Sequence, residues 1–272
     1  MFLNLCVLAS GSSGNCTVVW TPEEALLIDC GSVSGRFVRE QLSAVGVPPA
    51  RVKGMLITHA HSDHIGPTAL RLARDHGIPL YLHPDIYGDC MKTAAAAGLA
   101  SLREEGLVRF HADETFALGA FGVQPFRTRH RMGCVTRSQG FCVVHDGAKI
   151  GYLTDCGAID DTIVAAMRGA RVAVIEANHD VDMVASGPRP WPVKKWILSD
   201  DGHLSNDAAA ALIRRISGPL LPLRHVLLAH ISKDHNTCAT LPGWFAPRIN
   251  TDTVTLTITH HRAPSVVVRV RE

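Results

Sequence analysis

The chain has 272 residues, of which 46% are hydrophobic, and its formal net charge is +2. This length is sufficient for one substantial core, and so mild a charge is not by itself a sign of a nucleic-acid partner. The aromatic content of 6% predicts few stacking platforms for bases.

Apolar runs typical of strands alternate with amphipathic segments in the first half of the chain. Strands are predicted at residues 3–9, 16–20, 25–30, 52–58 and 79–83. Helices are predicted at residues 34–45 and 69–76, and a further helix around residues 94–97 is expected to end at Gly98.

The second half of the chain is richer in strands. Residues 108–126 are predicted to form two strands around a turn, and residues 141–155 a hairpin with Asp146-Gly147 at its tip, because this dipeptide tolerates positive φ. Further elements are expected as helices at 160–167 and 205–216 and as strands at 172–177, 225–230 and 253–259. The segment 188–192, P-R-P-W-P, is interpreted as a rigid surface loop.

This order of elements predicts an α/β fold with sheets in the middle and helices outside. Each half of the chain has several strands followed by alternating strands and helices, and no long linker separates the halves. This pattern favours a single domain over residues 1–272. No stretch is long and apolar enough to span a membrane, and the start of the chain lacks the features of a signal peptide. None of the eight cysteines forms a C-x-x-C pair, so a cytoplasmic protein with reduced thiols is expected. The fifteen histidines direct attention to metal binding.

The segment T-H-A-H-S-D-H, residues 58–64, places three histidines and an aspartate where a predicted strand ends. His59 and His61 are two residues apart and can project toward one point. Asp63 and His64 would lie in the first turn of a following helix, where a carboxylate is favoured. Mixed nitrogen and oxygen ligands suit divalent zinc or manganese. We therefore predict a metal site here rather than a set of helix-capping surface histidines.

Three further ligand-type residues, His130, Asp155 and His230, each follow an apolar run. Each one alone is equally compatible with a loop residue that bonds to backbone. Together they are expected to converge with the first cluster on one edge of the sheets.

H-A-H-S-D-H, with His130, Asp155 and His230 downstream, resembles the H-x-H-x-D-H motif set of the metallo-β-lactamase superfamily over nearly the whole chain. The resemblance implies a four-layer αβ/βα sandwich with the site at the edge between its two sheets. It also implies that Asp29, in L-L-I-D-C-G, supports the metal-binding loop.

Four segments resemble the YycJ/WalJ (VicX) group more closely: L-A-S-G-S-S-G-N-C, I-E-A-N-H-D, L-S-D-D-G-H-L-S-N and L-L-A-H-I-S-K-D-H-N. That group is associated with DNA exonuclease activity from the 5′ end. The resemblance therefore implies a phosphodiesterase that acts on nucleic acid, on DNA rather than RNA, with DNA repair as the associated process. The chain is too short to include the inserted β-CASP domain of other nucleases in the superfamily.

The resemblance also assigns the metal ligands. One divalent ion, Mn²⁺ or Zn²⁺, would be held by His59, His61 and His130, a second by Asp63, His64 and His230, and Asp155 would bridge the two. An aspartate bridge beside an Asp–His site favours phosphodiester over lactam hydrolysis.

The order Glu176, His203, His230 resembles the arrangement in RNase Z, where a Glu–His pair protonates the leaving group. His203 would then donate the proton and Glu176 would orient it, and we group Asp63 with them as a candidate catalytic residue. The alternative is a helix-capping Glu176 and a His203 that merely precedes the N-cap residue Ser205.

Several residues are predicted to contact substrate or support the site. The turn S-G-S-S-G-N, residues 10–15, offers hydroxyls and amides to a phosphate, although a plain β-turn is an equal alternative. The candidate substrate contacts are Ser12, Ser13, Asn15, Ser232, Lys233 and Asn236. His179 and His235 are candidates for positioning metal ligands. A basic rim around His130 is predicted from Arg127, Arg129, Arg131 and Arg137. Surface or strand-edge positions are expected for His76, His111, His225, His260 and His261, and core packing for Cys156.

Two other functions fit the same sequence. One is a small-molecule hydrolase, such as a cyclic phosphodiesterase or a glyoxalase-II-like thioesterase. The other is a regulator whose metal ions only stabilise the fold.

Overall fold

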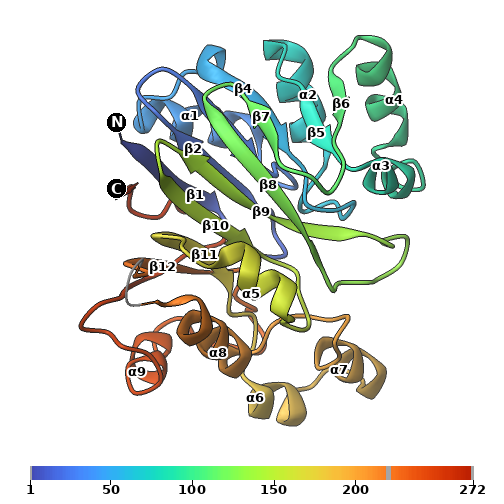
Figure 1. Ribbon diagram of the computed structural model, residues 1–272. Helices are drawn as coiled ribbons and strands as arrows, with labels where there is room; N and C mark the ends of the chain where they lie inside the picture. The colour runs from blue at the N-terminus through green and yellow to red at the C-terminus, as the bar shows by residue number, and fades with distance from the viewer. Residues whose placement is uncertain (1, 219–221, 271–272) are drawn as a thin grey trace.

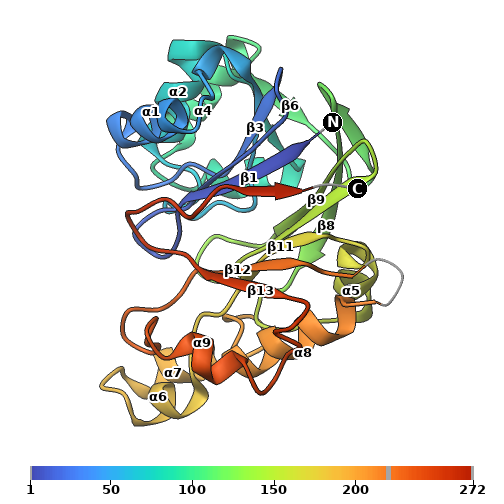
Figure 2. The same cartoon turned by 90° about the vertical axis from the view of Figure 1, so that its left-hand side faces the viewer.

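The computed structural model describes residues 2–218 and 222–270 and has four layers. Two sheets pack face to face, helices α1 to α4 cover the outer face of one sheet, and helices α5 to α9 cover the other (Figures 1 and 2). The predicted αβ/βα sandwich is thereby confirmed.

Each sheet contains seven strands within the described residues. In spatial order the first sheet consists of β14 (Val268–Val270), β1 (Leu3–Ala9), β2 (Cys16–Trp20), β3 (Ala25–Ile28), β4 (Val52–Leu56), β5 (Leu80–Leu82) and β6 (Val108–Phe110). The second consists of β13 (Thr255–Ile258), β12 (His225–Ala229), β11 (Val172–Glu176), β10 (Ala148–Leu153), β9 (Ser138–His145), β8 (Phe121–Thr128) and β7 (Phe116–Leu118).

The helices divide between the two outer layers. Those on the first sheet are α1 (Gly35–Ala44), α2 (Pro67–His76), α3 (Pro84–Cys90) and α4 (Ala96–Glu104), with a short 3₁₀ turn at Pro49–Arg51. Those on the second are α5 (Asp161–Met167), α6 (Val181–Ser186), α7 (Trp191–Ile197), α8 (Asn206–Ile216) and α9 (Leu241–Phe245).

Alternation along the strands builds the three apolar interfaces between the layers. On β1, Leu5 and Val7 face the second sheet, whereas Cys6 and Leu8 face the helices. Side chains of a strand alternate between its two faces. Both faces of β1 are buried because the second sheet covers one and helices cover the other. This explains why β1 is an unbroken apolar run rather than an alternating one.

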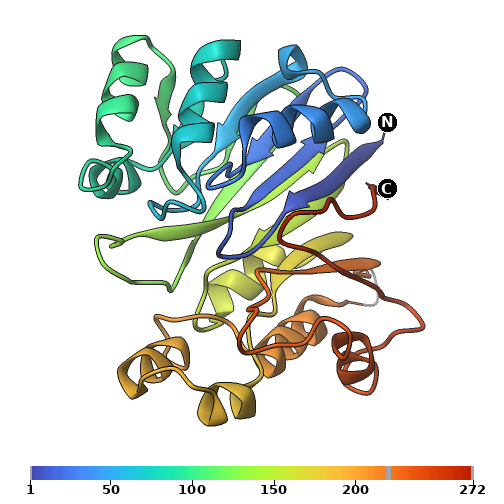
Figure 3. The same ribbon diagram turned by 180° about the vertical axis from the view of Figure 1, so that it is seen from behind.

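The parallel strands determine where the site lies. Strands β3 to β6 run parallel to one another, as do β10 to β13, and their carboxyl ends meet at one edge of the sandwich. The α6–α7 hairpin, gold in Figure 3, extends beyond that edge opposite the β8–β9 loop. Trp196 of α7 joins the two, because its Nε1–H donates to the carbonyl of Arg131 at 2.9 Å.

Three element predictions are wrong. Gly98 does not end a helix: α4 continues through it, and its Cα faces Leu70 of α2, whose Cδ1 would lie 2.8 Å from a Cβ at this position. Residues 108–126 form three strands rather than two, and β6 joins the first sheet. The segment 188–192 is not a loop throughout, since α7 begins at Trp191 with Pro192 in its first turn.

The hairpin prediction is confirmed. Strands β9 and β10 pair antiparallel around Asp146 and Gly147, with φ of 46° and 76°.

Candidate metal centre and active site

The predicted ligands lie just beyond strand ends at the shared edge. His59 follows β4, His130 follows β8, Asp155 follows β10 and His230 follows β12. The chain turns sharply at these positions. Asp155 and His230 have φ of 55° and 50°, and Asp29, just after β3, has φ of 57°. Non-glycine residues in the left-handed region cost about 1–3 kcal/mol each and cluster at functional sites.

Three imidazole nitrogens form a first group. His59 Nε2 lies 2.9 Å from His61 Nδ1, which lies 3.3 Å from His130 Nε2. The nitrogens of a tetrahedral zinc site, each about 2.0–2.1 Å from the ion, are roughly 3.3 Å apart. The group therefore has the dimensions of one cation site.

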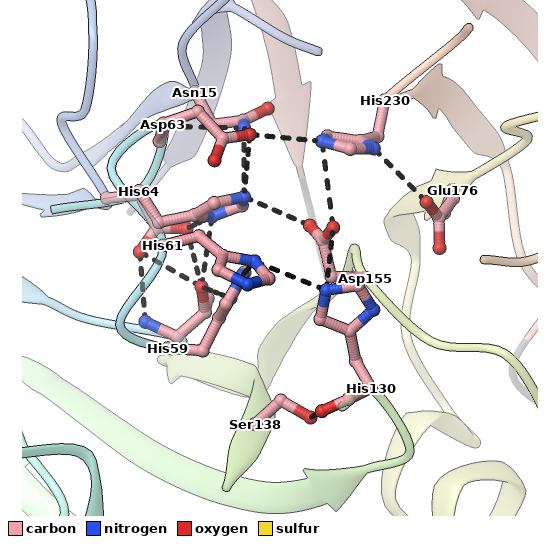
Figure 4. Close-up of polar contacts among 12 residues, drawn as sticks. Asn15, His59, His61, Asp63, His64, His130, Ser138, Asp155, Glu176 and His230 are labelled. Atoms are coloured by element: carbon pink, nitrogen blue, oxygen red, sulfur yellow. Dashed lines mark hydrogen bonds and ion pairs between the residues drawn. The ribbon is translucent and has the colours of Figure 1, made fainter. Parts of the chain in front are cut away.

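A second group lies beside it, and a carboxylate stands between them (Figure 4). Asp63 Oδ2 is 3.4 Å from His64 Nε2 and 3.5 Å from His230 Nε2. Asp155 Oδ2 is 3.1 Å from His64 Nε2, and Asp155 Oδ1 is 3.8 Å from His130 Nε2 and 3.7 Å from His230 Nε2. One carboxylate thus faces both groups, as a bridging ligand must.

Hydrogen bonds behind the histidines orient their rings. The Thr58 hydroxyl donates to Asp29, and its oxygen lies 3.1 Å from His59 Nδ1. Asp29 Oδ2 also lies 2.8 Å from His64 Nδ1. With Nδ1–H donating outward, Nε2 of each ring is left to bind a metal. Asp29 therefore contacts both Thr58 and His64 of the motif, the position from which we expect it to support the metal-binding loop.

Backbone carbonyls orient the other two rings of the first group. His130 Nδ1 lies 2.8 Å from the carbonyl of Gly202, and His61 Nε2 lies 3.3 Å from that of Met132. His61 therefore presents Nδ1 to the centre, whereas His130 presents Nε2. The lone pairs of these ring nitrogens face one another. Asp155 Oδ2 is buried and makes no hydrogen bond in the described chain. Both features suit a pair of divalent cations.

Charge differs between the two groups. Burial lowers the pKa of His59, and lowers that of His130 to about 4, so the first group is neutral and ready to bind a metal. Burial also opposes the charge of His230, but Asp155, Asp63 and Glu176 outweigh it and raise its pKa to about 10. For Asp155, burial would raise the pKa, but His230 and His64 outweigh it and hold it well below its usual range.

This asymmetry predicts that only the second group releases protons when it binds a metal. His64 also has a raised pKa, so protons must leave His64 and His230 before either can serve as a ligand. Between pH 6 and 8 the affinity of the second ion should rise about tenfold per pH unit for each proton released, and that of the first should change little. Calorimetric titrations in buffers of different ionisation enthalpy measure this release. Equal proton release at both sites would contradict the assignment.

The predicted Glu–His pair is present. His203 Nδ1 lies 2.7 Å from Glu176 Oε1, and the same oxygen lies 3.2 Å from His230 Nδ1. Burial would raise the pKa of Glu176, but His203 and His230 outweigh it and hold the pKa at about 2. Glu176 ends β11 and caps no helix; its other oxygen accepts from the amides of Cys156 and Leu204. One buried carboxylate therefore orients both a candidate acid and a candidate ligand.

Asn15 does not lie where a substrate phosphate could reach it. It is fully buried, and its Nδ2 lies 3.3 Å from Asp63 Oδ2 and 3.0 Å from His64 Nε2. Its Oδ1 accepts from the amide of Gly11 at 2.8 Å. Burial thus makes Asn15 a support for the metal-binding loop rather than a phosphate contact.

Gly31 packs directly against the same loop. A Cβ on Gly31 would overlap with the backbone of Asp63 and His64, which cannot move without displacing two ligands. We expect Gly31→Ala to destabilise the fold by about 1–3 kcal/mol and to reduce the metal content. Urea unfolding and metal analysis measure the two effects.

Gly88→Ala is the matched control for this substitution. Gly88 lies in α3, and a Cβ there meets nothing within 4 Å. Alanine should stabilise the protein slightly at this position, by up to about 1 kcal/mol. Similar stability and metal content of the two variants would show that the close contact between Gly31 and the backbone of Asp63 and His64 does not require glycine.

Other predicted substrate contacts divide into exposed and buried residues. Ser12 and Lys233 are exposed, and Lys233 Nζ lies 3.1 Å from Ser13 Oγ. Ser232 is half-buried and its hydroxyl accepts from the amides of the turn that follows. Asn236 is buried and bonds to Asn206 and the carbonyl of Ala177, so it holds the loop together rather than facing substrate.

The basic rim is smaller than predicted. Arg127, Arg129 and Arg131 are exposed beside His130, but Arg137 is buried and paired with Asp113.

Among the remaining histidines, the structure corrects one position. His111 is buried against Phe116 and Gln139 rather than placed at the surface. His179 is buried too, and in the described chain no hydrogen bond joins its ring to a candidate ligand. Cys156 packs in the core, as expected.

Two residues at the site were not predicted from the sequence. Thr58 precedes the first histidine, and its contact with Asp29 depends on the pairing of β3 with β4. Trp196 packs edge-on against His203 with ring centroids 5.2 Å apart. Pro192 in the first turn is the feature that would have revealed the helix that carries Trp196.

Comparisons with known proteins agree with this geometry. The family model described as "Beta-lactamase superfamily domain" matches residues 24–236. The chain belongs to the metallo-β-lactamase superfamily. Within this superfamily it is 32% identical to "Exodeoxyribonuclease YycJ" of Bacillus anthracis over 87% of this chain and 85% of that protein. It is 33% identical to "Exodeoxyribonuclease WalJ" of Streptococcus pneumoniae over 85% of this chain and 82% of that protein.

Solved structures show the same fold. The metallo-β-lactamase fold protein YhfI from Bacillus subtilis superposes with a TM-score of 0.71 at 15% identity, covering 99% of this chain and 100% of that one. The family model and the sequence identity to YycJ and WalJ confirm membership in the YycJ/WalJ group of the metallo-β-lactamase superfamily. They also confirm the prediction of a metal-dependent hydrolase. No helix within the described ranges is long and apolar enough to cross a membrane.

Proposed function

We propose that this protein is a dinuclear metal-dependent exonuclease that degrades DNA from the 5′ end. The observation that carries the proposal is one carboxylate, Asp155, between two groups of ligands, with the buried Glu176–His203 pair beside it. The names of its relatives support DNA as substrate. A single functional domain over residues 1–272, a role in DNA repair and a cytoplasmic location are parts of the same proposal.

The ligand assignments are those that the resemblance implies. His59, His61 and His130 would hold one ion, Asp63, His64 and His230 the other, and Asp155 would bridge them. Mn²⁺ or Zn²⁺ at these positions supplies Lewis-acid stabilisation of charge on the phosphate and a more acidic water molecule.

The side chains of the protein account for the proton transfers. A water oxygen bonds to phosphorus in line with the leaving oxygen and passes one proton to the Asp63 carboxylate, the bond from phosphorus to O3′ breaks, and His203 gives its Nε2 proton to O3′. Glu176 Oε1 lies 2.7 Å from His203 Nδ1 and thereby fixes the orientation of the ring. Its negative charge offsets the positive charge that the imidazolium carries before the proton is transferred. Asp63, which we grouped with the catalytic residues, lies at the exposed side of the second group, where the attacking water would enter.

Charged residues on either side of the centre could hold the strand. Arg127, Arg129 and Arg131 lie beyond His130, and Lys233 lies beyond His230. Such cations bind phosphates without regard to sequence.

Incubation of the protein with end-labelled DNA and RNA, single- and double-stranded, tests the proposal. With Mn²⁺ or Zn²⁺ we expect DNA to shorten progressively from its 5′ end, and a chelator to stop the reaction. Hydrolysis of cyclic nucleotides or thioesters without cleavage of either nucleic acid would instead support the small-molecule hydrolase. Preferential cleavage of RNA would contradict DNA as the substrate.

A further inference from the structure

A cavity of about 350 Å³ opens beside the candidate metal centre. Its walls come from the α6–α7 hairpin, the turn after β1 and the loops that follow β11, α7 and β12. The residues that matter here are Ser12, Arg189, Trp196, His203, Lys233 and Asp234.

The position of His203 determines which part of a substrate the cavity would receive. His203 lines the cavity, and its Nδ1 is bonded to Glu176, so the leaving oxygen must approach the other side of its ring. In the proposed reaction that oxygen is O3′ of the nucleotide on the 5′ side of the cut. This nucleotide therefore lies on the cavity side of the centre.

The dimensions of the cavity limit how much chain can enter it. Its volume is near the lower end of the range of about 300–1,000 Å³ typical of small-molecule pockets. At its outer end Arg189 of the α6–α7 hairpin is paired with Asp234 of the loop after β12. A further contact, Lys233 Nζ to Ser13 Oγ at 3.1 Å, joins that loop to the turn after β1. A volume of this size suits one nucleotide rather than a continuing strand.

The charges at this outer end suit a terminal phosphate. Arg189 carries five N–H donors, of which Nε and one Nη are bonded to Asp234. Lys233 carries three donors, and Ser13 takes one. Both cations are exposed, and the hydroxyl of Ser12 lies at the same cavity. Asp234 is the one carboxylate among the lining residues, and its charge is already paired with Arg189.

From these features, and building on the proposed exonuclease function, we propose that the cavity binds the 5′-terminal nucleotide. Arg189 and Lys233 receive its 5′-phosphate, and Trp196 and Val193 form an apolar wall for its sugar and base. The enzyme would then release one nucleotide per cut and prefer 5′-phosphorylated ends.

Product length and end preference test this proposal. Wild-type protein with Mn²⁺ should degrade DNA to mononucleotides, and it should remove the first nucleotide from 5′-phosphorylated DNA about tenfold faster than from DNA with a 5′-hydroxyl, because every later cut starts from a 5′-phosphate. Arg189→Ala and Lys233→Ala should each bring this ratio close to one. Lys195→Ala is the matched control, because it removes an exposed charge from α7 outside the cavity, and it should retain the wild-type ratio.

A binding measurement tests the cavity without catalysis. By calorimetry, thymidine 5′-monophosphate should bind wild-type and Lys195→Ala protein about tenfold more tightly than thymidine does, and Arg189→Ala and Lys233→Ala should lose this difference. Products of two or more nucleotides, or a ratio unaffected by both substitutions, would overturn the assignment of the cavity. If wild-type protein fails to degrade DNA, the exonuclease function itself is wrong, and the thymidine 5′-monophosphate titration still decides whether Arg189 and Lys233 bind a phosphate.

Discussion

Asp155→Ala is expected to reduce metal-dependent hydrolysis by about a thousandfold or more. The oxygens of Asp155 face both groups of ligands, at 3.1 Å from His64 Nε2 and 3.8 Å from His130 Nε2. Its loss leaves two sets of imidazoles with less negative charge to hold two dications, and several kcal/mol of charge stabilisation disappear with them. Metal analysis should show fewer than two ions per chain, and rate measurements with excess metal should not restore activity.

Two further variants separate this effect from a loss of stability. Asp155→Asn keeps a residue that tolerates the observed φ of 55°, so it should remain folded while losing most of the activity. Asp75→Ala removes an exposed carboxylate near the end of α2 and should behave as wild type. Full activity of Asp155→Asn with two ions bound would refute the bridging role.

His203→Ala is expected to lower turnover of DNA by about 10²–10⁴-fold while both metal ions stay bound. His203 is a candidate acid because its Nδ1 is held by Glu176 at 2.7 Å and its ring lines the cavity where the leaving oxygen would lie. A leaving group that needs no proton provides the sharpest test. Hydrolysis of bis(p-nitrophenyl) phosphate, whose p-nitrophenolate departs unprotonated, should fall far less than cleavage of DNA.

Comparison of His203→Ala with Glu176→Gln distinguishes the proposed proton donor, His203, from the residue that orients it, Glu176. Glu176 Oε1 lies 2.7 Å from His203 and 3.2 Å from His230, so this substitution should affect both proton donation and the second metal ion. His203→Ala should leave metal affinity unchanged. Equal losses with DNA and with bis(p-nitrophenyl) phosphate in His203→Ala would rule out its role as the acid and indicate a general disturbance of the site.

The part of the site that the sequence predicted most directly is its most local part. Four candidate ligands occupy residues 59–64, and a strand end followed by a turn can bring them together in few arrangements. Asp155 and His230 were predictable for a related reason: each ends an apolar run, and parallel strands bring their carboxyl ends to one edge.

Several side chains were assigned wrongly or missed because their burial depends on distant elements. Asn15 has the composition of an exposed turn around it, yet the metal-binding loop covers it. Arg137 was predicted on the rim, but it is buried with Asp113 as its partner. Gly98 ends no helix; it lies inside α4, where it faces Leu70 of α2.

The sequence by itself determined most of the strands and their alternation with helices, since these follow from hydrophobic period, and the resemblance of its motifs implied the ligand set and the chemistry that this set permits. Only the tertiary structure decided which nitrogen of each histidine faces the centre, that Glu176 contacts both His203 and His230, and that Arg189 and Lys233 lie at one cavity. Those features arise where loops from both halves of the chain meet, and such contacts depend on packing between segments up to 220 residues apart, which local pattern does not encode.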